Sequence, residues 1–61
     1  MAKLINKDVV CDILHISQST AYKVIKQLNE ELKDKGYMTI SGRVPEEYLR
    51  ERYNLKNESY N

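Results

Sequence analysis

The sequence predicts a small, mainly α domain of three helices, with a short β-hairpin between the second helix and the third. Three observations predict this fold class. Apolar residues recur at helical spacing over 9–14 and over 21–32. Met38 and Ile40 alternate with other residues ahead of a Ser-Gly pair, a pattern typical of a strand that runs into a tight turn. Pro45 and two glutamates follow, which is a common start of a helix.

The first helix is expected over about residues 7–14, after a short apolar segment at 2–5. Asn6 has the side chain of a good N-cap, and Asp8 is favourably placed in the first turn. His15 and Ile16 then form a turn. A second N-cap, Ser17, starts the second helix.

The second helix is expected from about 18 to 35. Its apolar residues follow at steps of three and four and form one stripe: Ala21, Val24, Ile25, Leu28 and Leu32. Gly36 is placed to end the helix in a left-handed conformation. The hairpin is expected over 37–44, with the turn at 41–42, and the third helix is expected to begin at Pro45. Residues 1–53 form the predicted domain, and 54–61 are expected to be a flexible tail.

Length and charge limit what the chain can do alone. A chain of 61 residues buries only about 60% of its unfolded surface, so dimerisation or docking on a large ligand would help stabilise it. The net charge is only +1. Residues 1–27 hold four lysines and two aspartates, whereas 28–61 hold six basic and seven acidic side chains. The basic excess therefore lies in the first half of the chain, and it predicts modest non-specific affinity for nucleic acid.

Several classes of function find no support in the sequence. Cys11 is the single cysteine, which allows no internal disulfide and no cysteine-based zinc site and fits a reducing compartment. No apolar run is long enough to span a membrane and no signal-peptide pattern opens the chain, so a cytoplasmic protein is expected. No phosphate loop, carboxylate pair or nucleophile with its base is found. We expect no enzyme activity, no cofactor and no metal site.

The first two predicted helices have their packing residues at the spacing of a helix-turn-helix motif. Two helices that cross steeply need a small residue at their contact, an apolar residue after the turn and aliphatic residues inside the second helix. Cys11, Ile16, Ala21 and Val24 occupy these positions. One position departs from the pattern, because His15 stands where such turns usually hold glycine. Histidine tolerates the left-handed conformation better than most residues.

The second helix of such a motif lies in the DNA major groove, with its N-terminal residues at the base edges. Gln18 could bind adenine in a bidentate manner, and a lysine could bind guanine. The hydroxyls and the N–H groups at the helix start favour phosphate, and Arg43, at the tip of the hairpin, could enter a narrow minor groove. The predicted DNA contacts are Ser17, Gln18, Ser19, Thr20, Tyr22, Lys23, Lys26 and Arg43.

Structural explanations remain open for the same residues. Ser17 is an N-cap whatever it binds, the lysines could be the solvated face of an amphipathic helix, and Arg43 could be only a polar hairpin residue. Cys11 is interpreted as a packing residue and His15 as a turn residue. Tyr48, Leu49 and Tyr53 share one face of the third helix and are predicted as core or dimer contacts, and Leu28 and Leu32 are further candidates for a dimer contact.

The order of these pieces resembles the small winged helix-turn-helix proteins of the MerR-like and excisionase class. The resemblance covers about residues 4–53 and rests on four parts: the apolar Leu4-Ile5, the start of the recognition helix at Ser17/Thr20/Tyr22, the basic Gly42-Arg43-Val44-Pro45, and the helix at 46–53. Two features depart from the class: the second helix is about two turns longer, and His15 replaces the turn glycine.

The resemblance implies a double-stranded DNA-binding protein of a prokaryote, phage or mobile element. Such proteins bind repeated sites cooperatively, as small transcriptional regulators or as recombination directionality factors that assist an integrase. A homodimer or a cooperative multimer on DNA is therefore expected. The alternative is a protein-interaction module on the same scaffold, which docks on an integrase, replication protein or host nuclease without reading DNA; the acidic second half of the chain favours that alternative.

Overall fold

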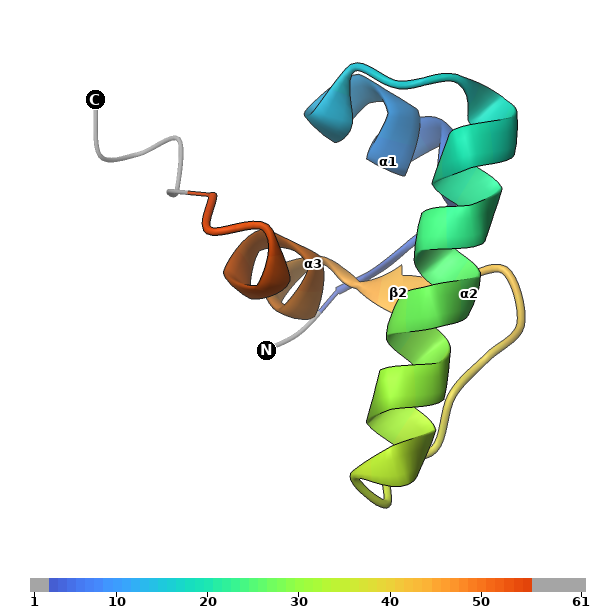
Figure 1. Cartoon of the computed structure of the whole chain (residues 1–61), viewed down its shortest axis with the longest axis vertical. Coiled ribbons are helices and arrows are strands. Elements are labelled where there is room, and N and C mark those ends of the chain that lie inside the picture. Colours follow the sequence, from blue (N-terminus) through green and yellow to red (C-terminus); the bar gives the residue numbers. More distant parts are fainter. Residues whose placement is uncertain (1–2, 56–61) are drawn as a thin grey trace.

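The computed structural model describes residues 3–55, and the long second helix is its central element (Figure 1). The elements follow in the order β1 (Leu4–Ile5), α1 (Lys7–Leu14), α2 (Gln18–Asp34), β2 (Val44–Pro45) and α3 (Glu46–Arg52). In Figure 1, α1 lies across the N-terminal end of α2, while α3 lies on the opposite side of α2 from the segment that links α2 to β2. The prediction of a mainly helical protein with three helices is confirmed.

Local capping explains the bounds of α1, which agree with the predicted range 7–14. The Asn6 side chain accepts a hydrogen bond from the Val9 N–H at 3.2 Å, as an N-cap does. The helix ends at His15, whose backbone is left-handed with φ 57° and ψ 50°. The His15 N–H donates to the carbonyl of Cys11 at 2.7 Å, so the turn is formed without glycine.

The bounds of α2 also follow from its two ends. The Ser17 hydroxyl accepts from the Thr20 N–H at 3.3 Å and caps the N-terminus. At the other end the Gly36 N–H donates to the Lys33 carbonyl and the Tyr37 N–H to the Leu32 carbonyl, both at 2.9 Å. This pair of bonds is a Schellman motif, which needs a residue with positive φ, and Gly36 has φ +92°.

The expected local hairpin over 37–44 is not formed. The small antiparallel sheet pairs β1 with β2, in the register Leu4 with Pro45 and Ile5 with Val44. This pairing buries the side chains of Ile5 and Val44 together, whereas Met38 stays 97% exposed. A local hairpin would leave Ile5 without a strand partner, and burial of apolar surface decides between the two pairings.

The segment 37–43, which we call the α2–β2 loop, still contains the predicted turn. The Arg43 N–H donates to the Ile40 carbonyl at 3.1 Å, and Gly42 has φ +80° at the third position of the turn. A positive φ at this position is the feature of a type II turn that favours glycine. The hairpin wing is thus replaced by a loop with one turn, whose exit strand pairs with the N-terminal strand.

The third helix starts one residue later than expected. Pro45 is extended, with φ −64° and ψ 132°, and forms the last residue of β2 and the N-cap position of α3. The Glu46 N–H donates to the Lys3 carbonyl at 2.8 Å, which joins the helix start to the N-terminal segment. At the other end Asn54 has φ 56°, and the Leu55 N–H donates to the Arg50 carbonyl at 2.7 Å. The rest of the predicted tail, 56–61, lies outside the described residues.

The core lies where α1, α2, α3 and the sheet meet. It consists of eight buried side chains: Ile5, Val10, Ala21, Ile25, Leu28, Leu32, Val44 and Leu49. Three of the residues predicted as possible dimer contacts, Leu28, Leu32 and Leu49, are thus in the core; Leu49 is 0% exposed. These leucines fill the interior of the protomer and do not reach its surface.

Within 3–55, no helix has the length and apolar character needed to cross a membrane.

Candidate nucleic-acid interface

The contact between α1 and α2 determines which face of α2 remains exposed. Ala21 is fully buried, and Cys11, Ile16 and Val24 pack against the core as partly buried neighbours. The four positions identified from motif spacing therefore all face inward. On α2, the residues between the buried positions point away from the core by helical geometry. All eight predicted DNA contacts are exposed.

Three hydroxyl side chains form a connected group at the start of α2. The Ser17 Oγ donates to the Thr20 Oγ1 at 3.0 Å and lies 3.3 Å from the Ser19 Oγ. The same Ser17 oxygen caps the helix, so the structural explanation of Ser17 is confirmed. Ser19 and Thr20 remain exposed beside the helix N-terminus, where backbone N–H groups favour an anion.

Gln18, the first residue of α2, has a partner that the sequence did not reveal. Its Nε2 donates to the Oδ1 of Asp8 on α1 at 3.0 Å. Both side chains are exposed. Asp8 is therefore part of this surface, although its position suggested only a role in the first turn of α1.

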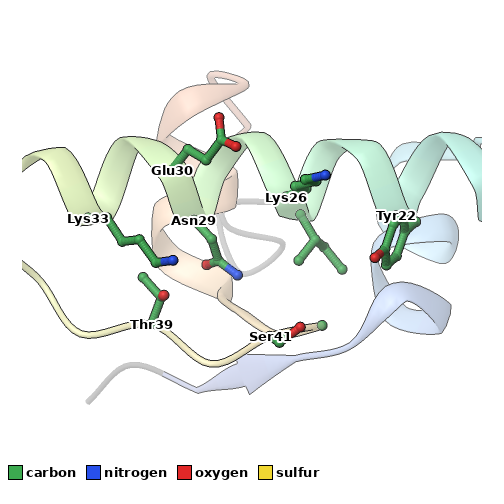
Figure 2. Close-up of a pocket in the computed structure, with 9 residues that line it drawn as sticks. Tyr22, Lys26, Asn29, Glu30, Lys33, Thr39 and Ser41 are labelled. Atoms are coloured by element: carbon green, nitrogen blue, oxygen red, sulfur yellow. The ribbon is translucent and has the colours of Figure 1, made fainter.

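Tyr22 lies where two hollows meet. The larger hollow, of about 400 Å³, runs between α2 and the α2–β2 loop, as Figure 2 shows. Along α2 it is lined by Tyr22, Ile25, Lys26, Asn29, Glu30 and Lys33, and along the loop by Thr39, Ser41 and Gly42. The smaller hollow, of about 270 Å³, is lined by Asn6, Lys7, Asp8, Tyr22, Ile25, Gly42 and Arg43.

The two hollows show which predicted residues the fold brings together. Tyr22 and Arg43 line the smaller hollow, and Tyr22 and Lys26 line the larger one. Lys23 lines neither and lies on the outer surface of α2. Lys7 and Lys33 were not predicted as contacts. Lys33 follows Lys26 by seven residues on the same helix face, so helical periodicity could have identified it.

Asn29 fixes the α2–β2 loop against α2. Its side chain is buried, and its Nδ2 donates to the Ile40 carbonyl at 3.2 Å and to the Arg43 carbonyl at 2.9 Å. The Asn29 Oδ1 has no hydrogen-bond partner among residues 3–55. This asparagine therefore sets the distance between the loop and α2, and with it the width of the larger hollow (Figure 2). No sequence signal singled it out.

A second polar cluster joins α2 to α3 on the other side. Glu31 accepts from the Tyr48 hydroxyl at 2.8 Å and from the Arg52 Nε and Nη2 at 2.7 and 2.8 Å. The hydrogen bonds from Arg52, followed by that from Tyr48, lower the pKa of Glu31 to about 2. The same contact raises the pKa of Arg52. The Lys35 Nζ lies 5.0 Å from the centre of the Tyr48 ring, within cation–π range.

The cluster also bears on the predicted dimer contacts. Tyr48 is half-buried and uses its hydroxyl within the protomer, while Leu49 is in the core. Tyr53 is 45% exposed and is the one exposed member of the predicted trio. Among residues 3–55, no group of three or more His, Cys, Asp or Glu side chains could hold a metal ion.

The fold and the exposed face of α2 place the chain among small, mainly helical proteins. The chain contains a helix-turn-helix arrangement, in which the turn at 15–17 joins α1 to α2. No protein-family model matches the chain, and no solved structure was found to match it. The chain is 39% identical over 44 residues to the ICEBs1 excisionase of Bacillus subtilis (strain 168), a match that covers 72% of this chain and 69% of the relative.

The chain therefore belongs to the family of the ICEBs1 excisionase. This result confirms the excisionase part of the resemblance noted in the sequence. The resemblance to MerR-like winged proteins stays a prediction, and the two-stranded sheet of this protein is built with the N-terminal strand.

Proposed function

We propose that the protein is a non-catalytic recombination directionality factor that binds double-stranded DNA, with α2 in the major groove and the α2–β2 loop beside it. Membership of the excisionase family supports the proposal. The observation that carries it is the division of α2 into two faces. One face is buried in the core, and the other presents hydroxyl, amide and lysine side chains that are exposed over its N-terminal half.

The start of α2 has the chemistry of a site for phosphate and base edges. Ser19 and Thr20 offer hydroxyls beside the helix N-terminus, which favours phosphate. Gln18 is at the position from which a recognition helix reads bases. Lys23 lies one turn further along and Lys26 two turns, and both neutralise phosphates on the flanks of the groove.

The hollow between α2 and the α2–β2 loop accepts a stretch of sugar-phosphate backbone. Lys26 and Lys33 lie on its α2 side, and the hydroxyls of Thr39 and Ser41 lie on its loop side (Figure 2). Lysines and hydroxyls are common partners of phosphate oxygens. Among residues 3–55, Glu30 is the one acidic side chain that lines this hollow, and its charge opposes phosphate.

The low net charge favours binding in several copies. One protomer with a net charge of +1 neutralises few phosphates overall, so its affinity for a single site is modest. Repeated sites, filled by a homodimer or a cooperative multimer, would supply the rest. A protein partner such as an integrase fits the family assignment. Transcriptional regulation remains the second outcome of the same DNA-binding surface.

The proposal is tested by DNA binding of matched lysine variants. The double variant Lys23→Ala/Lys26→Ala should weaken DNA binding. The slope of log affinity against log salt concentration should become less steep by about 2, because each lost phosphate contact removes about 0.9 from it. Fluorescence anisotropy with DNA from the neighbourhood of the gene, or selection from a random pool, provides the measurement.

The matched control is Lys3→Ala/Lys35→Ala, which removes the same charge elsewhere. Lys3 lies 3.9 Å from Glu46 of α3, and Lys35 contacts Tyr48, so both lie on the α3 side of the molecule. The control should keep nearly the whole salt slope of the wild type. Equal losses in the two double variants would contradict the placement of DNA on α2, and a wild type that binds no DNA would contradict the proposal itself.

Exposed apolar side chains on the α2–β2 loop favour the alternative of a protein-interaction module. Tyr37 is 62%, Met38 97% and Ile40 55% exposed. A folded wild type that shifts no DNA, yet co-purifies with one partner and loses it on Met38→Ser/Ile40→Ser, would favour this function over DNA binding.

A further inference from the structure

The hydrogen bond between Gln18 and Asp8 connects the first residue of α2 to the first turn of α1. The donor is the Gln18 Nε2 and the acceptor is the Asp8 Oδ1, 3.0 Å apart. A carboxylate can only accept hydrogen bonds. The contact therefore determines which end of the Gln18 amide faces α1, and it holds an exposed side chain in one orientation.

We propose that Asp8 is a positioning residue that orients the Gln18 amide so that it reads adenine and rejects guanine. The inference rests on the proposed DNA-binding function. A primary amide carries two N–H donors and one carbonyl acceptor. Asp8 takes one donor, which leaves one N–H and the carbonyl. In the major groove adenine presents the complementary pair, the N7 acceptor and the N6 amino donor.

Guanine presents two acceptors, N7 and O6, at the same edge. With the amide held by Asp8, the Gln18 carbonyl would face O6 and neither oxygen would have a proton to share. Without Asp8 the amide could rotate by half a turn and present its nitrogen to O6. The Asp8 carboxylate thus excludes the orientation in which the Gln18 amide would donate to the O6 of guanine.

The placement of Asp8 supports this role over a purely local one. A carboxylate near DNA repels phosphates, so its presence on this surface weakens binding unless it does something else. Lys7 and Arg43 line the same small hollow and offset part of that charge. A role in the first turn of α1 would need the negative charge but not the contact with Gln18.

Asp12 provides a matched control on the same helix. It follows Asp8 by one turn and is exposed, and its side chain makes no hydrogen bond or ion pair within the part of the chain that the structure describes. Asp8→Asn and Asp12→Asn remove the same charge with almost no change in shape. Only Asp8→Asn replaces the acceptor that faces Gln18 by an amide, which can pair with Gln18 in either orientation.

The experiment compares base preferences by selection of bound DNA from a random pool, followed by sequencing. The wild type should prefer adenine over guanine at one position by about tenfold or more. Gln18→Ala should lose this preference. Asp8→Asn should reduce it to within about threefold while the other positions stay unchanged, and Asp8→Glu, which keeps an acceptor-only group, should restore most of it. Asp12→Asn should keep it.

Three outcomes in the variants overturn the inference. The first is an Asp8→Asn variant with the wild-type preference, and the second is an equal loss of preference in Asp12→Asn. The third is a Gln18→Ala variant that reads the same bases as the wild type. A wild type that binds DNA without base preference would also overturn it and leave the proposed function standing, whereas a wild type that binds no DNA would overturn both.

Discussion

Both halves of α2 pack apolar side chains into the core, but they differ in their polar contacts. The N-terminal half packs on α1 through apolar side chains such as Ala21 and Val24, and its polar side chains stay on the surface. The C-terminal half has polar ties on both sides, from Asn29 to the α2–β2 loop and from Glu31 to α3. Apart from the Gln18 amide, which bonds to Asp8, the polar groups of the first half stay available for a ligand, while the second half uses Asn29 and Glu31 to hold its neighbours.

The largest expected effect tests the apolar side of this comparison. Ile25 is 2% exposed at the middle of α2, and Ile25→Ala should destabilise the fold by about 2–5 kcal/mol through lost burial and the cavity left behind. A domain of this size has little stability to spare, so we expect the variant to be largely unfolded by circular dichroism. Gln27→Ala, two residues away and exposed, is the control and should unfold like the wild type.

The next effect tests the polar tie to the loop. Asn29→Asp replaces the amide donor by an oxygen that faces two carbonyl oxygens, so we expect a loss of about 1–3 kcal/mol. Hydrogen exchange of the Arg43 amide, which bonds to Ile40, should become faster. Gln27→Glu makes the same chemical change on the exposed face. If Gln27→Glu destabilised the protein as much as Asn29→Asp, charge and not the loop contact would be responsible.

A smaller effect is expected at the turn that sets the angle between α1 and α2. His15 is held in the left-handed region, which costs a residue with a side chain about 1–2 kcal/mol and costs glycine nothing. His15→Val should lower the free energy of unfolding by about 1 kcal/mol, and His15→Gly should match or exceed the wild type. Urea unfolding provides the measurement. A His15→Gly variant less stable than His15→Val would show that the imidazole itself stabilises the turn.

The smallest effect concerns the tie to α3 and depends on pH. The pKa of Glu31 is lowered to about 2 in the folded protein, from an ordinary value of 4.5. A lowered pKa means that the ionised carboxylate stabilises the fold above pH 4.5, and that this contribution is lost as the pH falls from 4.5 to 2. Since the pair is partly exposed to solvent, which screens the two charges, the effect should be small.

Glu31→Gln removes the titrating group and keeps the shape of the side chain. Its unfolding midpoint should fall less steeply than that of the wild type between pH 5 and pH 2. Glu30→Gln, at the neighbouring exposed position, should follow the wild-type curve. Parallel curves for Glu31→Gln and the wild type would show that the link between Glu31 and Arg52 contributes nothing to the pH dependence.

The same difference between apolar and polar contacts explains what the sequence could predict. Caps at Asn6 and Ser17, the helix end at Gly36 and the inward positions of α2 depend on residues close in sequence, and all agree with the structure. The partner of β2 depends on residues about 40 positions apart, whereas the alternation near Ile40 by itself predicts a local hairpin. The sequence predicts Leu49 as a core or dimer contact, because a short helix alone does not show which neighbour covers it.

The candidate site divides in the same way. Helical geometry was enough to predict that Gln18, Tyr22 and Lys26 point outward. It could not predict that Asp8 holds Gln18 or that Asn29 holds the loop, since both contacts depend on the direction of side chains from different elements. Which of the exposed residues touch DNA stays a prediction.

The pairing of β1 with β2 has a consequence for the order of folding. Leu4 and Pro45 pair although most of the described chain lies between them, whereas α1 and α2 are joined by a three-residue turn. Closing a long loop costs more entropy than closing a short one, so contacts between distant residues form late. We therefore expect the transition state for folding to contain the α1–α2 pair, with the sheet and α3 docking afterwards. Substitutions at Ile5 or Val44 should then mainly speed unfolding. Substitutions at Val10 or Ala21 should mainly slow folding.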